Sequence, residues 1–529
     1  MGGSLDQLCE RTSHVCAPAL PSPHRRPPVT AGGPPVRGGL SSWRILVMVT
    51  AAAAPMSSIM GNLPLALAMG GGPELVGAVA LTTVVLLCFS VGYAAMSRTV
   101  GGTGTLHVYV MRGLGRPAGV GAALLAVLSY TSLAIGLAGA FGYFTSLVFA
   151  TVGVHVHWLL FAGLGIALTG LLGYRSVDLS ARILAVLLVA ELLVVVIYDV
   201  AVLADRGLEA LPAAALAPGP VTFDSLGFGL MFAFISFAGF ESAALYGEEA
   251  TDPTRSIPRA TFLAVGLMGL FYLVTSWITV GAIGLDEAES TAQSELGNLL
   301  FGLTSRYASP LVSQAMALLL CTSLLASMLA MHNAASRYLL TLGRDRILPA
   351  ALGRLHPRHY SPAAASSVQT VLAAAVITSF AATGLDPYLN LATSLIALST
   401  LGILTLQAFA AVAIVVHFQR RSARGRWRIR LAAAIGAVGL LYATALLCAN
   451  YRTLTGTDSR VIGALPALVG VAVIGGAGYG LWLRSHRADL YAGLSEAAPS
   501  ASEAGPSAAG DGQSHRPPSA NGVPTGPTP

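Results

Sequence analysis

The sequence has little charge and no lysine. Only 10% of its 529 residues are charged, against about 25% in ordinary soluble proteins, and all 30 basic residues are arginine. The low charge excludes a water-soluble protein, because the chain has too little polar surface to cover a soluble particle. The absence of lysine excludes P-loop nucleotide binding and Schiff-base chemistry.

Clustered metal ligands and catalytic motifs are also missing. The five cysteines are scattered without CxxC spacing, so neither a zinc site nor a disulfide scaffold is indicated. The sequence contains neither HExxH nor GxSxG, the motifs of metalloproteases and serine hydrolases. We therefore expect no catalytic residues, no bound metal and no cofactor, and hence a protein that is not an enzyme.

Long apolar runs are abundant instead, since hydrophobic residues make up 54% of the chain. About 20 consecutive apolar residues are needed to cross the roughly 30 Å hydrocarbon core of a bilayer. Twelve stretches meet this length, so we predict an all-α integral membrane protein in the lipid bilayer. The predicted spans are 43–69, 74–97, 119–149, 155–174, 179–204, 222–246, 260–284, 310–340, 362–383, 388–417, 430–450 and 461–484.

The two ends of the chain have a different composition. Residues 1–40 are rich in proline, glycine and arginine, and residues 488–529 in serine, alanine, glycine and proline. Such segments bury too little apolar area to offset their loss of entropy on folding, so we predict two disordered tails. The first apolar run is too long and too far from Met1 for a signal peptide.

The arginines predict the orientation in the membrane. Threading the spans alternately places only four of the 30 arginines on one side, namely Arg206, Arg306, Arg452 and Arg460. We call the opposite side, which also receives both tails, the arginine-rich side. Basic residues favour the cytoplasmic face, so we predict a plasma-membrane protein with both termini in the cytoplasm. The basic run 420–430 is then a topology signal, and we expect no nucleic-acid binding.

Two predicted spans are interrupted by residues that disfavour helix. The first contains Pro55, Gly61 and Pro64, and the sixth contains Gly239 and the charged Glu241. Spans 1–5 (43–204) and 6–10 (222–417) can be two halves, and an odd number of spans gives them opposite orientation. Inverted repeats whose first helices are broken are typical of transporters with a binding site at mid-membrane. The alternative is two kinked helices within ordinary packing.

Three segments resemble the amino acid-polyamine-organocation permeases, which have the LeuT-like fold. Residues 232–260, "FAFISFAGFESAALYGEEATDPTRSIPRA", are similar to the sixth span and following loop of that family. Residues 333–357 are similar to the end of its eighth span, and residues 101–119 to its second-to-third-span loop. Two departures stand out: His107 replaces a usual aromatic residue, and Leu63 replaces a second glycine found in many members.

The resemblance implies a fold and a function. It implies a ten-helix transport core (43–417) with discontinuous helices 1 and 6, and two peripheral helices within 430–484. It also implies a secondary transporter for an amino acid or related amine that works by alternating access and is coupled to H⁺ or Na⁺. An amino-acid-binding membrane sensor that does not transport its ligand would carry the same motifs.

The two interruptions supply candidate substrate-binding groups. Backbone amides exposed at 58–62 would suit a carboxylate, and carbonyls freed at 236–238 would suit an ammonium group. Two phenylalanines could cover a bound side chain, although packing in the core is their alternative role. The candidates are Ser58, Gly61, Asn62, Ser236, Phe237, Ala238, Gly239 and Phe240.

Two glutamates are the candidates for ion coupling. Glu241 lies within the sixth predicted span and Glu191 near the middle of the fifth. A charged side chain at the bilayer centre costs about 3 kcal/mol on insertion scales, and such residues usually mark an ion or proton pathway. We therefore expect proton coupling. Sodium bound by span 1 carbonyls with Ser323 and Ser327 is the competing interpretation, and a structural hydrogen bond is the alternative for each glutamate.

Overall fold

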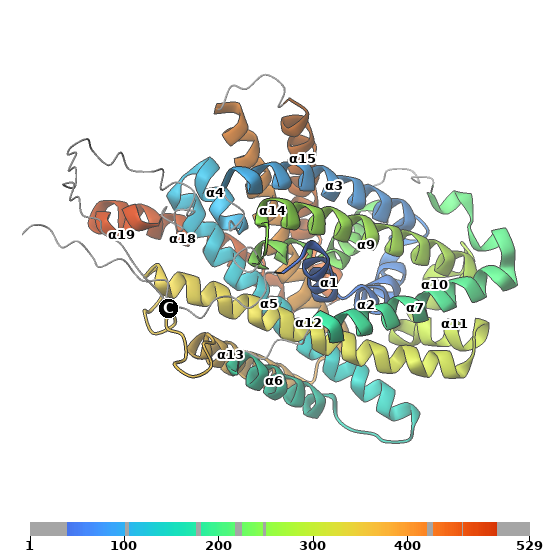
Figure 1. Ribbon diagram of the computed structural model, residues 1–529. Coiled ribbons are helices and arrows are strands. Elements are labelled where there is room, and N and C mark those ends of the chain that lie inside the picture. The colour runs from blue at the N-terminus through green and yellow to red at the C-terminus, as the bar shows by residue number, and fades with distance from the viewer. Residues whose placement is uncertain are drawn as a thin grey trace, which may run out of the picture. The chain divides into compact units, whose positions relative to one another are not determined.

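The computed structural model describes residues 40–100, 105–175, 181–216, 225–246, 250–420, 427–456 and 459–494 (Figure 1). These residues are helical apart from turns, loops and one isolated bridge between Leu40 and Ala250. The prediction of an all-α protein is therefore confirmed. Most of both predicted tails, and residues 101–104 of the loop that resembles the permease family, lie outside the described residues.

The described helices succeed one another in three consecutive parts of the chain. The first part forms α1 (Ser42–Ala53), α2 (Pro55–Ala66), the π-helix η1 (Leu67–Gly71), α3 (Leu75–Val100), α4 (Leu106–Leu114), α5 (Arg116–Thr151), α6 (Trp158–Tyr174), α7 (Ala181–Arg206), η2 (Gly207–Ala210) and η3 (Ala213–Leu216). The middle forms α8 (Ser225–Ser236), η4 (Phe240–Tyr246), α9 (Pro253–Ile283), α10 (Ala288–Glu295), η5 (Leu296–Asn298), α11 (Leu299–Tyr307), α12 (Pro310–Arg344), α13 (Ala363–Ala381), the π-helix η6 (Pro387–Ala392) and α14 (Thr393–Arg420). The last part forms α15 (Trp427–Ala449), α16 (Tyr451–Thr455), α17 (Arg460–Ala464), α18 (Ala467–His486) and α19 (Ala488–Gly493).

Ten helical stretches of the described chain are long and apolar enough to cross a membrane. They are α1 to η1, α3, α5, α7, α9, α12, α13, η6 with α14, α15, and α17 with α18. Two shorter apolar helices, Trp158–Tyr174 and Gly227–Ala243, lie where the sequence predicts the fourth and sixth spans. That these two also cross, giving twelve spans, remains a prediction.

The first helix break lies at Ala54, between α1 and α2. Ala54 has left-handed backbone angles (φ 47°, ψ 69°), and Pro55 occupies the first position of α2. Proline has no amide hydrogen and therefore starts a helix readily but cannot continue one. The prediction of exposed amides at 58–62 is wrong, because α2 is continuous there and the amide of Ser58 bonds to the carbonyl of Ala54 at 2.9 Å.

The second break follows Ser236, where the sequence predicts it. The chain leaves α8 at Ser236, turns through Gly239 at φ 110° and continues as the tight helix η4. A β-carbon at Gly239 would lie 3.2 Å from the Cα of Ala53. Glycine is thus required at this position both by the backbone angle and by the close approach of α1. The two breaks therefore face each other.

The other helices support these two breaks from several sides. In Figure 1, α5 and α12 run side by side through the molecule, and α6 and α13 pair below them. Helix α14 also packs on α5, while α3 packs on α8 and α9. Of the two expected peripheral helices, α15 packs on α14 and α3, and α18 packs on α5.

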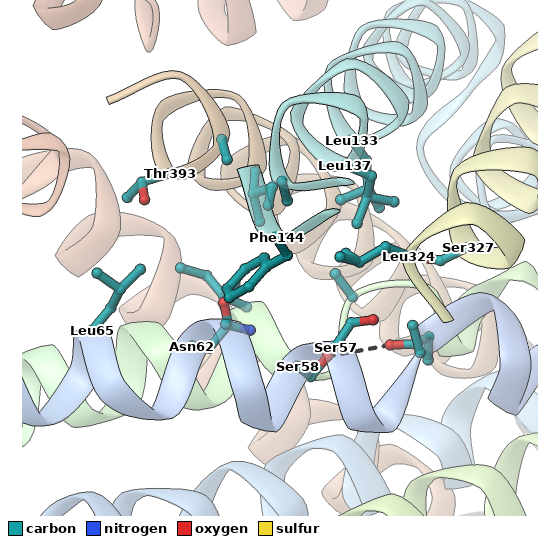
Figure 2. Close-up of a pocket in the computed structure, with 18 of the residues that line it drawn as sticks. Ser57, Ser58, Asn62, Leu65, Leu133, Leu137, Phe144, Leu324, Ser327 and Thr393 are labelled. Atoms are coloured by element: carbon teal, nitrogen blue, oxygen red, sulfur yellow. Dashed lines mark hydrogen bonds between the residues drawn. The ribbon is translucent and has the colours of Figure 1, made fainter. Parts of the chain in front are cut away.

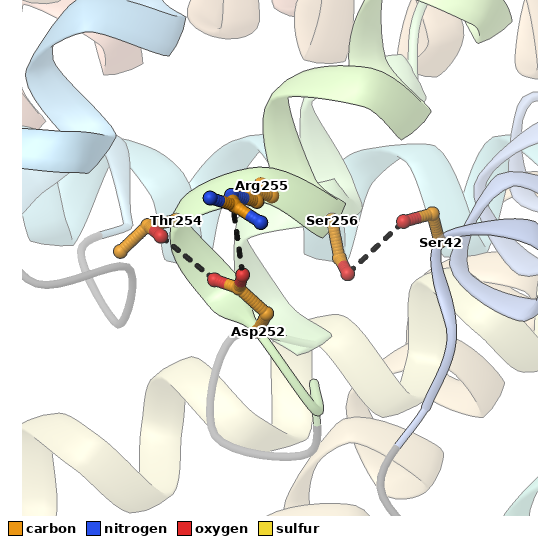
Figure 3. A network of polar contacts seen from close by, with 5 residues as sticks. All are labelled: Ser42, Asp252, Thr254, Arg255 and Ser256. Atoms are coloured by element: carbon orange, nitrogen blue, oxygen red, sulfur yellow. Dashed lines mark hydrogen bonds and ion pairs between the residues drawn. The ribbon is translucent and has the colours of Figure 1, made fainter.

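The first turn of α9, with its cap Asp252, contacts the start of α1 (Figure 3). The hydroxyl of Thr254 donates to Asp252 at 2.7 Å, and Arg255 pairs with the same carboxylate at 3.6 Å. These two groups hold the pKa of Asp252 below its usual value, the hydrogen bond from Thr254 contributing most. The hydroxyl of Ser42 donates to Ser256 at 3.0 Å. In the described structure, residues 252–256 of the permease-like segment 232–260 therefore lie where α9 contacts α1.

The predicted C-terminal tail begins too early. Residues 488–493 form helix α19, whereas the composition of 488–529 predicts disorder. The guanidinium of Arg116 lies over the ring of Tyr491, 5.0 Å from its centroid. Leu494 packs with Val120 and Leu483 in a small apolar cluster. The local sequence "LYAGL" supplies these contacts, which an average over the whole tail hides.

We predict that both termini lie on the cytoplasmic face, which labelling of single cysteines in intact cells will test. One variant would retain only the native Cys16 of the N-terminal segment. A second, otherwise cysteine-free variant would carry Arg452→Cys on α16, at an exposed position in the connection between α15 and α18. A membrane-impermeant maleimide should label the second variant and not the first. The reverse pattern would contradict the predicted orientation.

Candidate functional site

A cavity lies against the first helix break. The space between the atoms that line it measures about 720 Å³, including the open space at its mouth. Figure 2 shows α2 along one side, with Ser57 and Asn62 facing helices α5 and α12 and the hydroxyl of Ser58 directed toward the end of α1. The polar lining side chains are Ser57, Ser58, Asn62, Ser327, Tyr388 and Thr393.

The rest of the cavity wall is apolar. It comes from α2, α5, α8, α12 and α14, and none of the described lining residues is acidic or basic. The larger apolar side chains are Leu65, Leu133, Leu137, Phe144, Phe232, Ile235, Leu324 and Ile396. A ligand with an uncharged, apolar side chain would therefore meet matching surface.

The hydroxyl of Ser58 connects the two breaks. Its single proton has two acceptors within hydrogen-bond distance, the carbonyl of Ala53 at 3.3 Å and the carbonyl of Ser236 at 3.2 Å. Tyr272 donates to the same Ser236 carbonyl at 2.8 Å, and Asn62 donates to the hydroxyl of Ser236 at 3.1 Å. Because buried carbonyls need partners, these side chains replace the backbone bonds that the break in the sixth predicted span removes.

The first break also presents backbone groups of both polarities. Helix α1 ends at Ala53 with carbonyls directed out of the helix. Helix α2 begins with the amides of Met56 and Ser57, which precede Ser58, the first residue whose amide bonds within the helix. Helix dipoles make the end of α1 partly negative and the start of α2 partly positive. Ala52, Ala53 and Ser57 all line the cavity. Oppositely charged groups of one ligand could be held side by side at this break.

The structure brings four of the eight predicted substrate-binding residues to this cavity. Ser58, Gly61, Asn62 and Ala238 line it. The other four do not line it, namely Ser236, Phe237, Gly239 and Phe240. Ser236 is hydrogen-bonded to Ser58, Asn62 and Tyr272 outside the cavity, and Gly239 packs against α1. Phe237 meets Tyr272 at 5.2 Å between ring centroids, and Phe240 meets Phe89 at 6.4 Å. The two phenylalanines therefore pack in the core, the alternative that the sequence left open.

Several lining residues lie outside the interrupted spans and were not predicted. Phe144 from α5 and Leu324 from α12 reach the cavity, as does Tyr388 from η6, whose hydroxyl donates to the carbonyl of Gly61 at 2.6 Å. Tyr388 also stacks on Tyr143 with ring centroids 4.9 Å apart. No local motif marks these residues, because only the folded chain brings η6 beside α2.

Glu241 lies in a buried network beside the second break. Its side chain is 2% exposed. One carboxylate oxygen accepts from the hydroxyl of Tyr130 at 3.1 Å, and the other accepts from the amide of Gly239 at 3.1 Å and from Gln407 at 3.4 Å. The carboxylate does not line the cavity, but it holds the glycine at which the chain turns.

Glu191 occupies a second buried position, on α7. Its carboxylate accepts from the hydroxyl of Ser323 on α12 at 2.9 Å. One turn further, Ser327 donates to the carbonyl of Ala52 at 2.8 Å. The two hydroxyls of the competing sodium interpretation thus contact Glu191 and the end of α1. Among the described residues, no cluster of three His, Cys, Asp or Glu side chains could hold a metal ion.

The two departures from the family pattern are both buried. His107 on α4 packs its ring 5.6 Å from that of Tyr338, and its Nδ1 lies 2.7 Å from the hydroxyl of Thr105. Burial lowers the pKa of His107 to about 4, so the ring is neutral and takes the place of an aromatic side chain. Leu63 is also buried, on α2.

Solved structures resemble the described fold at low sequence identity. A manganese transporter of Eremococcus coleocola matches with a TM-score of 0.52 and 12% identity, covering 86% of this chain and 97% of that one. MhsT, solved in complex with L-phenylalanine, matches with a TM-score of 0.53 and 15% identity, covering 76% and 98%. These neighbours are LeuT-fold transporters, so the expected fold class is confirmed.

Curated relatives match over part of their length. An uncharacterized transporter of Mycobacterium tuberculosis is 30% identical over 46% of this chain and 49% of its own. The branched-chain amino acid permease BcaP of Bacillus subtilis is 22% identical over 56% of this chain and 65% of its own. The vacuolar cationic amino acid transporter 4 of Arabidopsis thaliana is 26% identical over 36% and 28%.

The family profile gives the broadest match. The profile described as amino acid permease matches residues 40–474, which include both helix breaks and every residue of the cavity. Because this match covers most of the sequence, the chain belongs to the amino acid permease family.

Proposed function

We propose that the protein is a secondary active transporter that carries an amino acid with an uncharged side chain across the membrane by alternating access. The observation that carries this proposal is the cavity at the break between α1 and α2, where backbone groups of opposite polarity stand side by side. The family membership and the fold of the solved neighbours support it.

An amino acid fits this break better than an amine. The amides at the start of α2, near Ser57, suit the carboxylate of a zwitterion. The carbonyls at the end of α1, at Ala52 and Ala53, suit its ammonium group, since each carbonyl oxygen can accept two hydrogen bonds. An amine lacks the carboxylate and would leave the amides at the start of α2 without a ligand partner.

The cavity wall favours an uncharged substrate side chain. Among the relatives, one name specifies branched-chain amino acids and another cationic amino acids. A cationic side chain buried in a protein needs an acidic partner, and none of the described lining residues is acidic. Leu133, Phe144 and Ile396 instead offer an apolar surface, which suits a branched-chain side chain.

Proton coupling through Glu241 is the second part of the proposal. The carboxylate holds the amide of Gly239 at the second break, and Ser58 joins that break to the end of α1. Protonation weakens the carboxylate as an acceptor, so loading a proton would loosen the turn at Gly239 and bias the conformation. Glu191, which reaches the end of α1 through α12, is the second proton candidate.

Alternating access would then be motion of one half of the core against the other. The halves predicted from the sequence are 43–204 and 222–417, each with a broken helix. In inverted-repeat transporters, such halves or bundles move around a fixed site at the breaks.

Replacing Gly61 with valine should abolish uptake of leucine into proteoliposomes while leaving membrane insertion unchanged. Gly61 lines the cavity, and a β-carbon there would meet no atom within 4 Å. The larger side chain would therefore occupy substrate space without forcing apart packed helices. Uptake of labelled leucine, compared with binding of leucine to the purified protein, also separates a transporter from a sensor.

The matched control is Gly163→Val on α6, where a β-carbon also meets no atom within 4 Å. Gly163 does not line the cavity, so this variant should transport at the wild-type rate. Both substitutions carry the same helical cost of a β-branched residue. Wild-type uptake by Gly61→Val would place the substrate elsewhere.

Replacing Glu241 with glutamine should abolish accumulation of leucine driven by a pH gradient and preserve leucine exchange. Glutamine can still accept a hydrogen bond from Gly239, but it cannot take up and release a proton. The measurement is net uptake and counterflow in proteoliposomes under imposed pH or sodium gradients. Glu295→Gln, at an exposed acid of α10, should leave both activities unchanged.

Two results would contradict proton coupling through Glu241. Uptake that follows a sodium gradient and ignores a pH gradient would favour a sodium site near Ser323 and Ser327. Normal pH-driven accumulation by Glu241→Gln would assign the proton to another group, and the same assay on Glu191→Gln would then test that residue.

A further inference from the structure

A second cavity adjoins the first toward the arginine-rich side. It encloses about 620 Å³ by the same measure, and Ala52 lines both cavities. Its walls come from α1, α7, η4 and α12, including Met48 and Leu184. These residues lie near the start of α1, the start of α7 and the end of α12, which the predicted topology places on the arginine-rich side.

Hydrogen-bond donors line this second cavity. Arg337 is the only charged group among its described lining residues, and Asn333 lies one turn before it on α12. The guanidinium carbon of Arg337 lies 5.8 Å from the ring centroid of Tyr246 on η4. This stacking holds the cation at the cavity wall. The chemistry of the wall is therefore suited to an anion.

Ser242 adds an independent observation. Its side chain is 3% exposed, lines the second cavity, and its hydroxyl has no hydrogen-bond partner among the described residues. A buried hydroxyl without a partner costs about 1 to 3 kcal/mol, so such a group calls for a ligand or water. Ser242 also directly follows Glu241, so the proton candidate and this donor share one short helix.

The two cavities differ in the charge of their described lining residues. Among these, the first cavity has no charged group, and the second has Arg337 and no acid. A zwitterion that leaves the amides of α2 toward the arginine-rich side enters a cavity in which its carboxylate finds a guanidinium.

We propose that the second cavity is a transit site for the substrate carboxylate, formed by Arg337 with Ser242 and Asn333. The proposal rests on the proposed transport of amino acids. Because Arg337 lines only the second cavity, it acts on substrate that arrives from, or leaves to, the arginine-rich side. The apparent affinity for amino acids measured at the arginine-rich face therefore depends on Arg337, whereas the apparent affinity measured at the opposite face does not.

The test is transport of leucine by oriented proteoliposomes, with the half-saturating concentration measured separately at each face. Arg337→Gln should raise this value about tenfold at the arginine-rich face, as expected for loss of a charged hydrogen bond, and leave it unchanged at the other face. Arg337→Lys should restore part of the affinity. Arg344→Gln, at an exposed arginine of the same helix, should match the wild-type protein.

Inhibition by leucinamide and by acetate identifies the group that is bound. Leucinamide lacks the carboxylate, so its inhibition from the arginine-rich face should be the same for the wild type and for Arg337→Gln. If acetate inhibits the wild type from this face as strongly as leucine does, the site binds free anions and not the substrate.

Four outcomes would overturn the inference alone: equal shifts at both faces, an equal shift for Arg344→Gln, an equal shift for leucinamide, or inhibition by acetate as strong as that by leucine. In each case leucine transport by the wild-type protein would still stand. Absence of leucine transport by the wild-type protein would instead refute the proposed function, and this inference with it.

Discussion

The contact on which the two helix breaks depend is the hydroxyl of Ser58, which lies within hydrogen-bond distance of the carbonyls of Ala53 and Ser236. This hydroxyl joins two helix breaks that are distant in sequence. Each break removes backbone hydrogen bonds within the hydrophobic core. The backbone groups left over are tolerated at this depth only when protein, water or ligand supplies partners. Ser58 and Asn62, which supply these partners, also form the polar edge of the cavity.

The sequence predicts most of the helices because a long apolar run in a chain with so little charge has few alternatives to a membrane helix. It also locates the second break, since Gly239 and Glu241 are conspicuous in an apolar run. It misplaces the first break by several residues. Pro55, at the first position of α2, marks the true start, whereas the small and polar residues at 58–62 suggest a break that continuous helical hydrogen bonding excludes.

The candidate site is less predictable than the fold. Ser58, Gly61 and Asn62 reach the cavity because they share a face of α2, which their helical spacing implies. Phe237 and Phe240 do not, because the direction of a side chain after a break depends on backbone angles that no sequence pattern fixes. Phe144 and Tyr388 are brought in by packing between distant helices. Such contacts leave no local signature in a single sequence.

Each break is tied to one buried glutamate by a different route. Glu241 bonds directly to the amide of Gly239, whereas Glu191 reaches Ala52 through Ser323 and Ser327 on successive turns of α12. A change of charge at Glu241 therefore acts on the turn at Gly239, next to the cavity-lining Ala238, and one at Glu191 acts toward Ala52, which lines the cavity. In the proposed cycle these contacts would let proton binding bias the conformation, because a ligand shifts a conformational equilibrium only by binding the two states differently. For the proposed proton coupling, the direct bond favours Glu241 over Glu191, whose route to the first break passes through two serines of α12.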